Sequence, residues 1–253
     1  MALYFGRRPV LEILSAGTPV GRIIMAQDAH GYLIERIEQR AHEQGVPIVR
    51  VPRQRVEELF PGRVHQGVIA ETQPAPEHSI EDLLQALQGS SSPPFVLILD
   101  GIEDPRNLGA LVRTAHAAGV QGIVIPKHRS AGITPVVAKA SAGATACTMI
   151  VRVANLVQTC EILKNKGLWI VGADVAGKDL WFQMDFACPF ALVLGGEGKG
   201  IRRLLREECD MIVRLPMMGS IGSLNVSVAG GILMYEMLRQ RMIRIPGYMD
   251  APW

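Results

Sequence analysis

The stretch FVLILDGIEDPRNLGALVRTAHAAGVQGIVIP, residues 95–126, decides the fold. It opens with an apolar run at 95–99 and closes with a second apolar run at 122–126. Between the two runs, Asp104 can cap a helix, Pro105 suits its first position, and apolar residues then recur at helical spacing. A short apolar strand on each side of a helix is typical of a parallel sheet that is covered on both faces.

The same alternation of strands and helices continues along the rest of the chain. Further strands are expected over 168–172, 191–194 and 211–215, and further helices over 155–165, 201–208 and 224–241. The pattern predicts an α/β domain from residue 95 onward. In such a domain, ligands bind beyond the carboxyl ends of the strands.

A smaller α/β module precedes this domain. Its strands are expected over 22–26, 47–51 and 68–71, and its helices over 8–15, 32–43 and 53–60. Pro, Ser and Gly cluster at both ends of the next segment, with one or two helical turns between them, which is typical of a linker. We therefore expect a module over 1–72, a linker over 73–94 and a second domain over 95–253.

The composition indicates a globular protein with a sizeable core. Of the 253 residues, 48% are apolar and only 20% are charged, which excludes global disorder. The net charge of +2 is no strong argument for a nucleic-acid partner. Arginine nevertheless outnumbers lysine by 20 to 6, and arginine suits forked phosphate contacts and stacking on bases. A codon-usage bias explains the same excess equally well.

The sequence predicts a cytoplasmic protein with no metal site and no membrane span. The four cysteines form no CxxC pair and have no histidine at ligand spacing, so we expect mostly buried, reduced thiols. The N-terminus lacks a secretory cleavage site. The uncharged stretch 221–235 is shorter than the roughly 20 residues of a membrane span and begins with polar residues, which favours a buried core helix.

Three loops at carboxyl ends of the expected strands carry a distinctive set of residues. Asn107 and Arg113 follow the first strand. The sequence GGEGKG at 195–200 follows the second, and its four glycines exceed the one or two that a plain turn needs. This loop matches neither the dinucleotide fingerprint nor the P-loop, and its carboxylate disfavours a phosphate ligand. Ser223 and Asn225 follow the third strand, with more polar groups than helix capping requires.

The three loops resemble a known family. DPRNLGALVRTA (104–115), LVLGGEGKGI (192–201) and LPMMGSIGSLNVSVA (215–229) resemble, in order, the three motifs of the SpoU/TrmH RNA 2′-O-methyltransferases. FGRRPVLEIL (5–14) and VHQGVIAE (64–71) resemble the small RNA-binding domain, similar to ribosomal protein L30, that precedes this catalytic domain. The pairing most resembles the bacterial 23S rRNA guanosine-2′-O-methyltransferases.

The resemblance implies a fold, a cofactor and partners. It implies a parallel sheet whose C-terminal part is tied into a deep trefoil knot, although knots are otherwise nearly absent from proteins. It also implies a homodimer formed through that region, with 23S rRNA, free or within a pre-ribosomal particle, as the substrate. S-adenosylmethionine would be the cofactor. By motif position, it would be held by Leu194, Gly195, Gly198, Leu215, Met217, Leu224 and Asn225.

The resemblance also assigns catalytic roles. Arg113 would activate the ribose 2′-hydroxyl. Because a guanidinium stays protonated, we expect Arg113 to bind the adjoining phosphate and to stabilise the developing alkoxide. Asn107 and Glu197 would orient the ribose and the loops, and Ser223 and Asn225 would complete the pocket. A purely structural role in holding turns remains the alternative for Glu197 and Asn225.

The first module would recognise the RNA. Its candidate contacts are Arg7, Arg8, Arg50, Arg53, Arg55, Arg63 and His65. Two other functions stay open: tRNA as the substrate of the same chemistry, and a non-catalytic RNA-binding factor of ribosome assembly. The first module argues against tRNA, because tRNA enzymes of the family often lack it. The presence of all five catalytic candidates argues against a non-catalytic factor.

Overall fold

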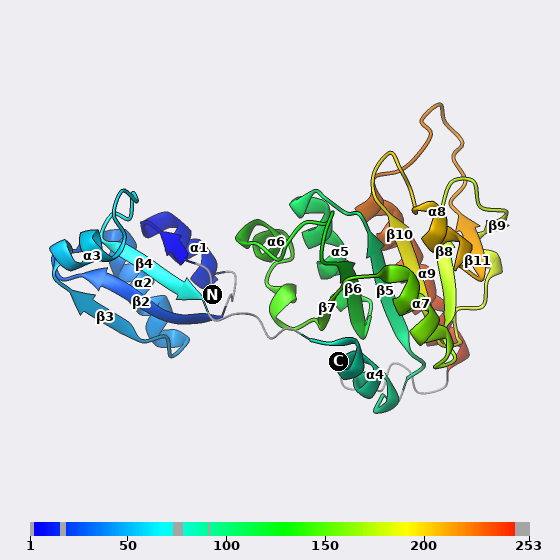
Figure 1. The fold of residues 1–253 in the computed structure, drawn as a ribbon, viewed down its shortest axis with the longest axis horizontal. Helices are drawn as coiled ribbons and strands as arrows, with labels where there is room; N and C mark the ends of the chain where they lie inside the picture. Colours follow the sequence, from blue (N-terminus) through cyan, green and yellow to red (C-terminus); the bar gives the residue numbers. More distant parts are fainter. Residues whose placement is uncertain (1–2, 16–18, 73–77, 91, 246–253) are drawn as a thin grey trace. The chain divides into compact units, whose positions relative to one another are not determined.

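The protein folds into two compact units. The computed structural model describes residues 3–15, 19–72, 78–90 and 92–245. The contacts between its residues divide the chain into Met1–Pro76 and Glu77–Trp253 (Figure 1). This division places the α/β module and the α/β domain in separate units, each of which is described by itself.

The first unit is a four-stranded mixed sheet with three helices. Its strands are β1 (Leu3–Phe5), β2 (Val20–Ala26), β3 (Ile48–Val51) and β4 (Val68–Thr72), in the order β1-β4-β2-β3. Its helices are α1 (Arg7–Ser15), α2 (Tyr32–Glu43) and α3 (Arg53–Leu59). The six predicted elements are confirmed within one or two residues. Strand β1 escaped prediction because three residues are too few for a periodic pattern.

The pairing of the strands brings several loops of the first unit to one edge of its sheet. β4 is antiparallel to both β1 and β2, whereas β3 is parallel to β2. The carboxyl ends of β1, β2 and β3 therefore lie at the same edge as the start of β4. The loops at this edge, residues 6–7, 27–31, 52 and 60–67, are called the recognition edge below.

The second unit is a seven-stranded parallel sheet, as predicted. Its strands are β5 (Phe95–Asp100), β6 (Gly122–Pro126), β7 (Ile150–Val153), β8 (Trp169–Ala173), β9 (Asp179–Leu180), β10 (Phe190–Gly195) and β11 (Met211–Arg214). They lie in the order β7-β6-β5-β10-β8-β11-β9, and every pair is parallel. Strands β7 and β9 were not predicted, and β9 has only two residues, too few for a periodic pattern.

Helices cover both faces of this sheet (Figure 1). They are α4 (Ile80–Gln88), α5 (Pro105–Ala117), α6 (Pro135–Ala140), α7 (Leu156–Lys164), α8 (Arg203–Glu207) and α9 (Val226–Arg244), with 3-10 turns at Ala144–Ala146 and Trp181–Gln183. Alternate residues of β5 face opposite sides: Leu97 packs with residues of α5 and α9, and Ile98 packs with residues of α4, α7 and α8. Both faces are thus apolar, which explains the unbroken apolar run.

Helix α4 lies inside the segment expected to be a linker. Ser79 and Asp82 form a capping box at its start, and Leu83 and Leu87 are buried against the sheet. A Cβ on Gly122 of β6 would lie only 2.3 Å from Leu83 Cδ1. Residues 78–90 therefore pack as part of the second unit, and the linker expected over 73–94 extends too far. Its first residues, 73–77, lie outside the described part of the chain.

The cysteines and the long C-terminal helix differ in part from expectation. Cys160 is buried, Cys188 and Cys209 are half-buried, and Cys147 is exposed. Burial raises the pKa of the Cys160 and Cys209 thiols to about 12, so both stay protonated at neutral pH. Helix α9 packs on the sheet through Leu233, Met234 and Met237 as expected, but its opposite face is exposed, so it is not the fully buried core helix that was predicted. Among the described residues, no helix is long and apolar enough to cross a membrane.

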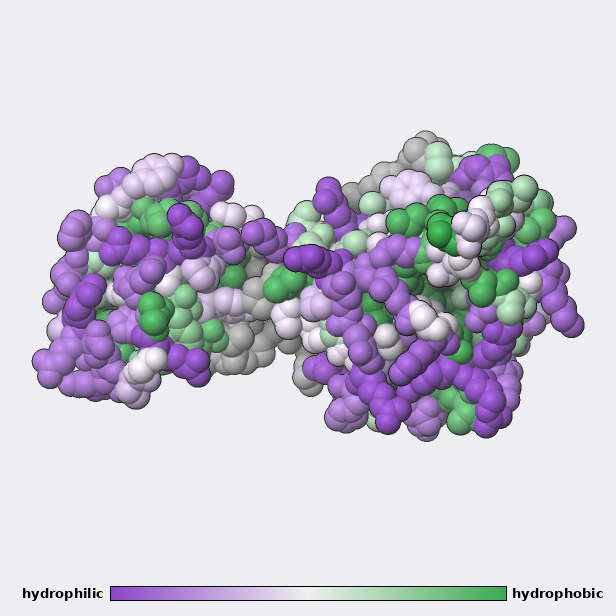
Figure 2. Space-filling view, turned by 90° about the horizontal axis from the view of Figure 1, so that it is seen from above, coloured by the Kyte–Doolittle hydropathy of each residue, from purple (hydrophilic) through white to green (hydrophobic). Residues whose placement is uncertain are grey.

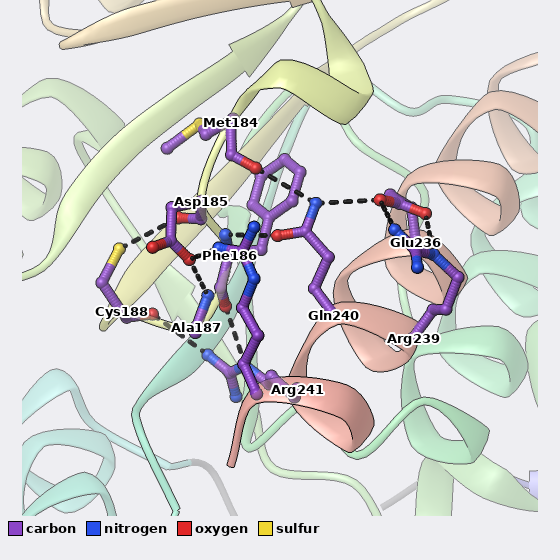
Figure 3. A network of polar contacts seen from close by, with 10 residues as sticks. Met184, Asp185, Phe186, Ala187, Cys188, Glu236, Arg239, Gln240 and Arg241 are labelled. Atoms are coloured by element: carbon purple, nitrogen blue, oxygen red, sulfur yellow. Dashed lines mark hydrogen bonds and ion pairs between the residues drawn. The ribbon is translucent and has the colours of Figure 1, made fainter.

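A buried guanidinium ties α9 to the sheet (Figure 3). Arg241 is only 1% exposed and lies against the packed rings of Phe95 and Phe190, 5.4 and 5.3 Å from their centroids. It donates to the carbonyl oxygens of Phe186 (3.1 Å), Pro93 (2.8 Å), Pro94 (3.0 Å) and Cys188 (3.3 Å). These carbonyls precede β5 and β10, so one side chain connects the end of α9 to the starts of two central strands.

We predict that Arg241→Met destabilises the protein. Methionine retains much of the volume but donates no hydrogen bond, which leaves several buried carbonyl groups without their partner. The expected loss is about 3 kcal/mol, or a Tm lower by roughly 6–12 °C, measured by thermal unfolding. Arg239→Met is the matched control, because the Arg239 side chain is 58% exposed and, among the described residues, its ion pair is with Glu236 on the same helix. An equal fall in Tm for both variants would contradict the role of burial.

Candidate active site

A cavity of about 550 Å³ lies beyond the carboxyl ends of β8, β10 and β11. It is lined by residues 173–175, by the glycine-rich loop after β10, by the segment from β11 to α9, and by the first turns of α9. Figure 2 looks onto these loops, and apolar surface gathers on this face of the second unit. All seven predicted cofactor residues line the cavity: Leu194, Gly195, Gly198, Leu215, Met217, Leu224 and Asn225.

Each of the four glycines at 195–200 has a local structural reason. A Cβ on Gly195 would lie 2.0 Å from the carbonyl carbon of Gly200, and one on Gly196 would lie 2.3 Å from the carbonyl oxygen of Gly101. Gly198 and Gly200 have φ angles of +77° and +62°, which favour glycine. The four glycines therefore exceed what a plain turn needs, because this loop folds tightly on itself and on the loop after β5.

A buried carboxylate holds the glycine-rich loop in place. Asp100, the last residue of β5, is 1% exposed. Its side chain accepts hydrogen bonds from the backbone N–H and the Nε of Arg202, at 2.9 and 2.7 Å, and its carbonyl oxygen accepts from Gly196 at 2.8 Å. Sequence reasoning missed Asp100, although an acid directly after an apolar strand, at the edge where ligands bind, was a usable signal.

Three predicted catalytic residues meet in a hydrogen-bonded triangle. Asn107 Nδ2 donates to Glu197 Oε1 at 2.7 Å, and Asn225 Nδ2 donates to the same oxygen at 2.9 Å and to Asn107 Oδ1 at 3.0 Å. Asn225 also caps α9, since its Oδ1 accepts from the backbone N–H of Ser227 at 2.9 Å. The triangle joins three loops that are far apart in sequence, so Glu197 and Asn225 have a structural role whatever else they do.

The other two catalytic candidates lie outside the triangle. Ser223 is exposed and lines the cavity. Arg113 is exposed on α5, six residues after Asn107, which corresponds to roughly 9 Å along a helix axis. It makes no hydrogen bond or ion pair within the described part of the chain. Its guanidinium is thus available to an anion from outside.

Sequence reasoning also missed the loop after β8. Asp174 lines the cavity, where its Oδ1 accepts from the backbone N–H of Ala176 at 2.8 Å and its Oδ2 pairs with Arg206 at 2.7 Å. The rule that ligands bind beyond strand ends applied to this strand as well. Among the lining residues that the structure describes, Asp174 and Glu197 are the charged ones. Because Asp174 pairs with Arg206, the carboxylate of Glu197, which forms no ion pair among the described residues, supplies the negative charge that favours a cationic ligand.

The seven predicted RNA contacts lie at or beside the recognition edge, and they differ in exposure and in ion pairing. Arg50, Arg53 and Arg55 form ion pairs with Glu38, Asp28 and Glu58. His65 is only 5% exposed and its Nδ1 accepts from the backbone N–H of Gly67, so it holds the loop and presents little surface to RNA. Arg63 lies over the ring of Phe5 at 5.6 Å. Within the described residues, Arg8 is exposed and has no ion-pair partner.

Arg7 joins two loops of this edge. Its Nη1 donates to the carbonyl oxygen of His30 at 3.1 Å and its Nε donates to that of Gln66 at 3.3 Å.

No group of three or more His, Cys, Asp or Glu side chains in the described ranges is placed to hold a metal ion.

Comparison with known proteins identifies the family. Residues 94–235 match the model of the SpoU rRNA Methylase family, and residues 3–78 match that of the RNA 2′-O ribose methyltransferase substrate-binding domain. The chain belongs to the SpoU rRNA methylase family. This finding confirms the resemblance that the three motifs indicated, and it identifies the chain as an RNA 2′-O-methyltransferase. The cofactor of the SpoU family is S-adenosylmethionine, as expected.

Named relatives share most of the chain. It is 42% identical over 236 residues to the putative TrmH family tRNA/rRNA methyltransferase YacO of Bacillus subtilis, covering 93% of this chain and 94% of YacO. It is 43% identical over 225 residues to the 23S rRNA (guanosine-2′-O-)-methyltransferase RlmB of Pseudomonas aeruginosa, covering 88% and 89%. The SpoU methyltransferase AviRb of Streptomyces viridochromogenes, solved with AdoMet, has the same fold (TM-score 0.70, 24% identity, 95% and 90% covered).

We predict that Gly196→Ala abolishes cofactor binding. The added Cβ would collide with the backbone of Gly101 and push the glycine-rich loop away from β5. Isothermal titration calorimetry with S-adenosylmethionine is expected to show at least a tenfold loss of affinity. Gly219→Ala is the control, since a Cβ there meets no atom within 4 Å. Wild-type affinity of Gly196→Ala would mean that the packed loop is not needed for binding.

Proposed function

We propose that this protein transfers the methyl group of S-adenosylmethionine to the ribose 2′-hydroxyl of a guanosine in 23S rRNA. The observation that carries the proposal is the convergence of the acidic cavity and the triangle of Asn107, Glu197 and Asn225 on one edge of a parallel sheet. The name and the 43% identity of RlmB support the substrate. We infer that the reaction takes place in the cytoplasm.

The cavity residues fit the cofactor. Gly195 and Gly198 expose main chain to the cavity, and Leu215, Met217 and Leu224 supply apolar walls. Such a combination suits a nucleoside with a thioether-like arm, which is recognised by backbone groups and apolar contact. When bound, S-adenosylmethionine supplies the methyl group on a sulfonium, whose positive charge the acidic lining favours.

The remaining residues act on the ribose. Because a guanidinium is a cation, the exposed Arg113 can bind the phosphate next to the target and stabilise negative charge on the 2′-oxygen as the proton leaves. The amides of Asn107 and Asn225 hold the carboxylate of Glu197 in one orientation, which fixes the geometry of the rim. Ser223 offers a further hydroxyl at the cavity.

Two other functions receive less support. The tRNA modifying enzyme TrmH/SpoU of A. aeolicus corresponds to only 65% of this chain, whereas RlmB corresponds to 88% of it, so the relatives favour rRNA. A non-catalytic assembly factor would not require an open cavity beside the triangle. A pre-ribosomal particle, rather than free rRNA, stays within the proposal as a form of the substrate.

We predict that Arg113→Ala abolishes methyl transfer and leaves cofactor binding intact, because Arg113 does not line the cavity. Labelled methyl transfer to rRNA from cells that lack this protein, with mapping of the modified nucleotide, measures the first effect, and calorimetry measures the second. Arg244→Ala is the control. Helix α9 has 19 residues and begins at the site, so Arg244, its last residue, lies at the end of the helix that is far from the site. Wild-type transfer by Arg113→Ala would refute its role, and methylation of tRNA alone would refute the substrate.

We further propose that the protein is a homodimer formed through the second unit, and that the unit contains the trefoil knot of its family. The face of α9 that points away from the sheet is apolar: Val228, Ile232 and Tyr235 are 50%, 40% and 51% exposed at spacings of four and three residues. A helix that is apolar on its outer face as well normally has a partner there. A second copy of this chain, with its own α9, is the occupant we propose.

We predict that Ile232→Asp yields a monomer, because a charge would be buried in the middle of this face. Sedimentation equilibrium measures the mass. Leu59→Asp in the first unit, where Leu59 is 42% exposed on α3, is expected to leave the mass unchanged. A wild-type protein that sediments as a monomer would refute the dimer directly.

A further inference from the structure

One exposed aromatic residue at the recognition edge has no role in the site described above. Tyr32, the first residue of α2, is 68% exposed. It follows the loop 27–31, which comes directly after β2. An aromatic ring gains little from such exposure in an isolated protein, so its position is consistent with a ligand that covers the ring.

The ring is held in a fixed orientation. Arg36, one helical turn later, donates from Nη1 to the Tyr32 hydroxyl at 3.1 Å, and its guanidinium lies 5.9 Å from the ring centroid. The loop before the ring is also fixed, because Arg7 donates to the carbonyl oxygen of His30. A ring that is already ordered loses little conformational entropy when a planar group stacks on it.

Several arginines lie in the segments next to Tyr32, and the same segments carry the acids Asp28, which pairs with Arg53, and Glu35. Arg7 connects the loop before Tyr32 to the loop that carries Arg63, Val64 and Gln66. In that second loop, Val64 is 83% exposed. Arg8 adds a cation without an ion-pair partner among the described residues. The edge thus combines an aromatic platform, an exposed apolar side chain and cations that can contact phosphates.

We propose that Tyr32 stacks on an unpaired base of the RNA substrate, with Arg8 and Arg63 contacting the flanking phosphates. The inference rests on the proposed function, and it states which side chains of the first unit contact the RNA. Stacking on aromatic side chains requires a base that is splayed out of a helix, since the bases of an A-form duplex are inaccessible. The ligand at this edge is therefore a loop, bulge or single strand.

The test compares the affinity and the salt dependence of RNA binding. Tyr32→Ala is expected to weaken binding of in vitro transcribed 23S rRNA roughly 5- to 100-fold, the range for loss of one stacked base. The slope of affinity against salt concentration is expected to stay unchanged, because no phosphate contact is lost. Tyr32→Phe is expected to keep most of the affinity. Arg8→Gln is expected to lower the salt slope by about one.

His42→Ala is the matched control, since His42 is an exposed ring in the last turn of the same helix, at the other end from Tyr32. A 20-base-pair duplex RNA is the second control, and Tyr32→Ala is expected to bind it like the wild type. Circular dichroism confirms that each variant is folded.

Unchanged affinity of folded Tyr32→Ala for 23S rRNA, while the wild type binds and methylates it, would overturn the stacking role and leave the proposed function intact. A changed salt slope would also overturn it, since the residue would then act through the charges. A wild type that neither binds nor methylates the rRNA would refute the proposed function instead. Pull-down of a ribosomal protein through Tyr32, without an effect on RNA affinity, would assign the ring to a protein partner.

Discussion

The geometry of the site depends on the buried carboxylate at the end of β5. Burying the Asp100 carboxylate at 1% exposure is costly unless polar groups satisfy it, and Arg202 supplies two of its hydrogen bonds. This pairing fixes the far end of the glycine-rich loop, and the bond from Gly196 to the Asp100 carbonyl fixes its near end. Only between these two fixed points can Glu197 reach both Asn107 and Asn225.

Parallel pairing explains why residues so distant in sequence meet. The carboxyl ends of β5, β10 and β11 lie at one edge, so the residues that follow them, Asn107, Glu197 and Asn225, converge without a long connection. The triangle is also self-consistent chemically, because the carboxylate accepts two amide protons and one amide oxygen caps α9. The structural and catalytic interpretations of these residues are therefore not exclusive.

Much of this arrangement could be predicted from the sequence, because apolar periodicity and the three motifs are local signals. What the sequence lacked was information on packing. Helix α4 resembled a linker because only the sheet contact of Leu83 shows where it belongs. The structural reason for two of the four glycines was hidden, because the close approach of Gly195 to Gly200 and of Gly196 to Gly101 exists only in three dimensions. His65 resembled an RNA contact because its burial cannot be read from its neighbours in sequence.

The excess of arginine over lysine can now be examined residue by residue. Arg7 contacts two carbonyl oxygens on different loops, Arg202 binds Asp100 through both Nε and Nη2, and Arg241 contacts four carbonyl oxygens. These patterns use the several N–H groups of a planar guanidinium, and the single ammonium of lysine could not form them together. A codon-usage bias suffices for arginines such as Arg203, whose ion pair with Glu207 lies at the surface, but it does not explain these three. Arginine in this protein therefore builds the loops first, and the cations left over at the recognition edge and on α5 are the ones available to RNA.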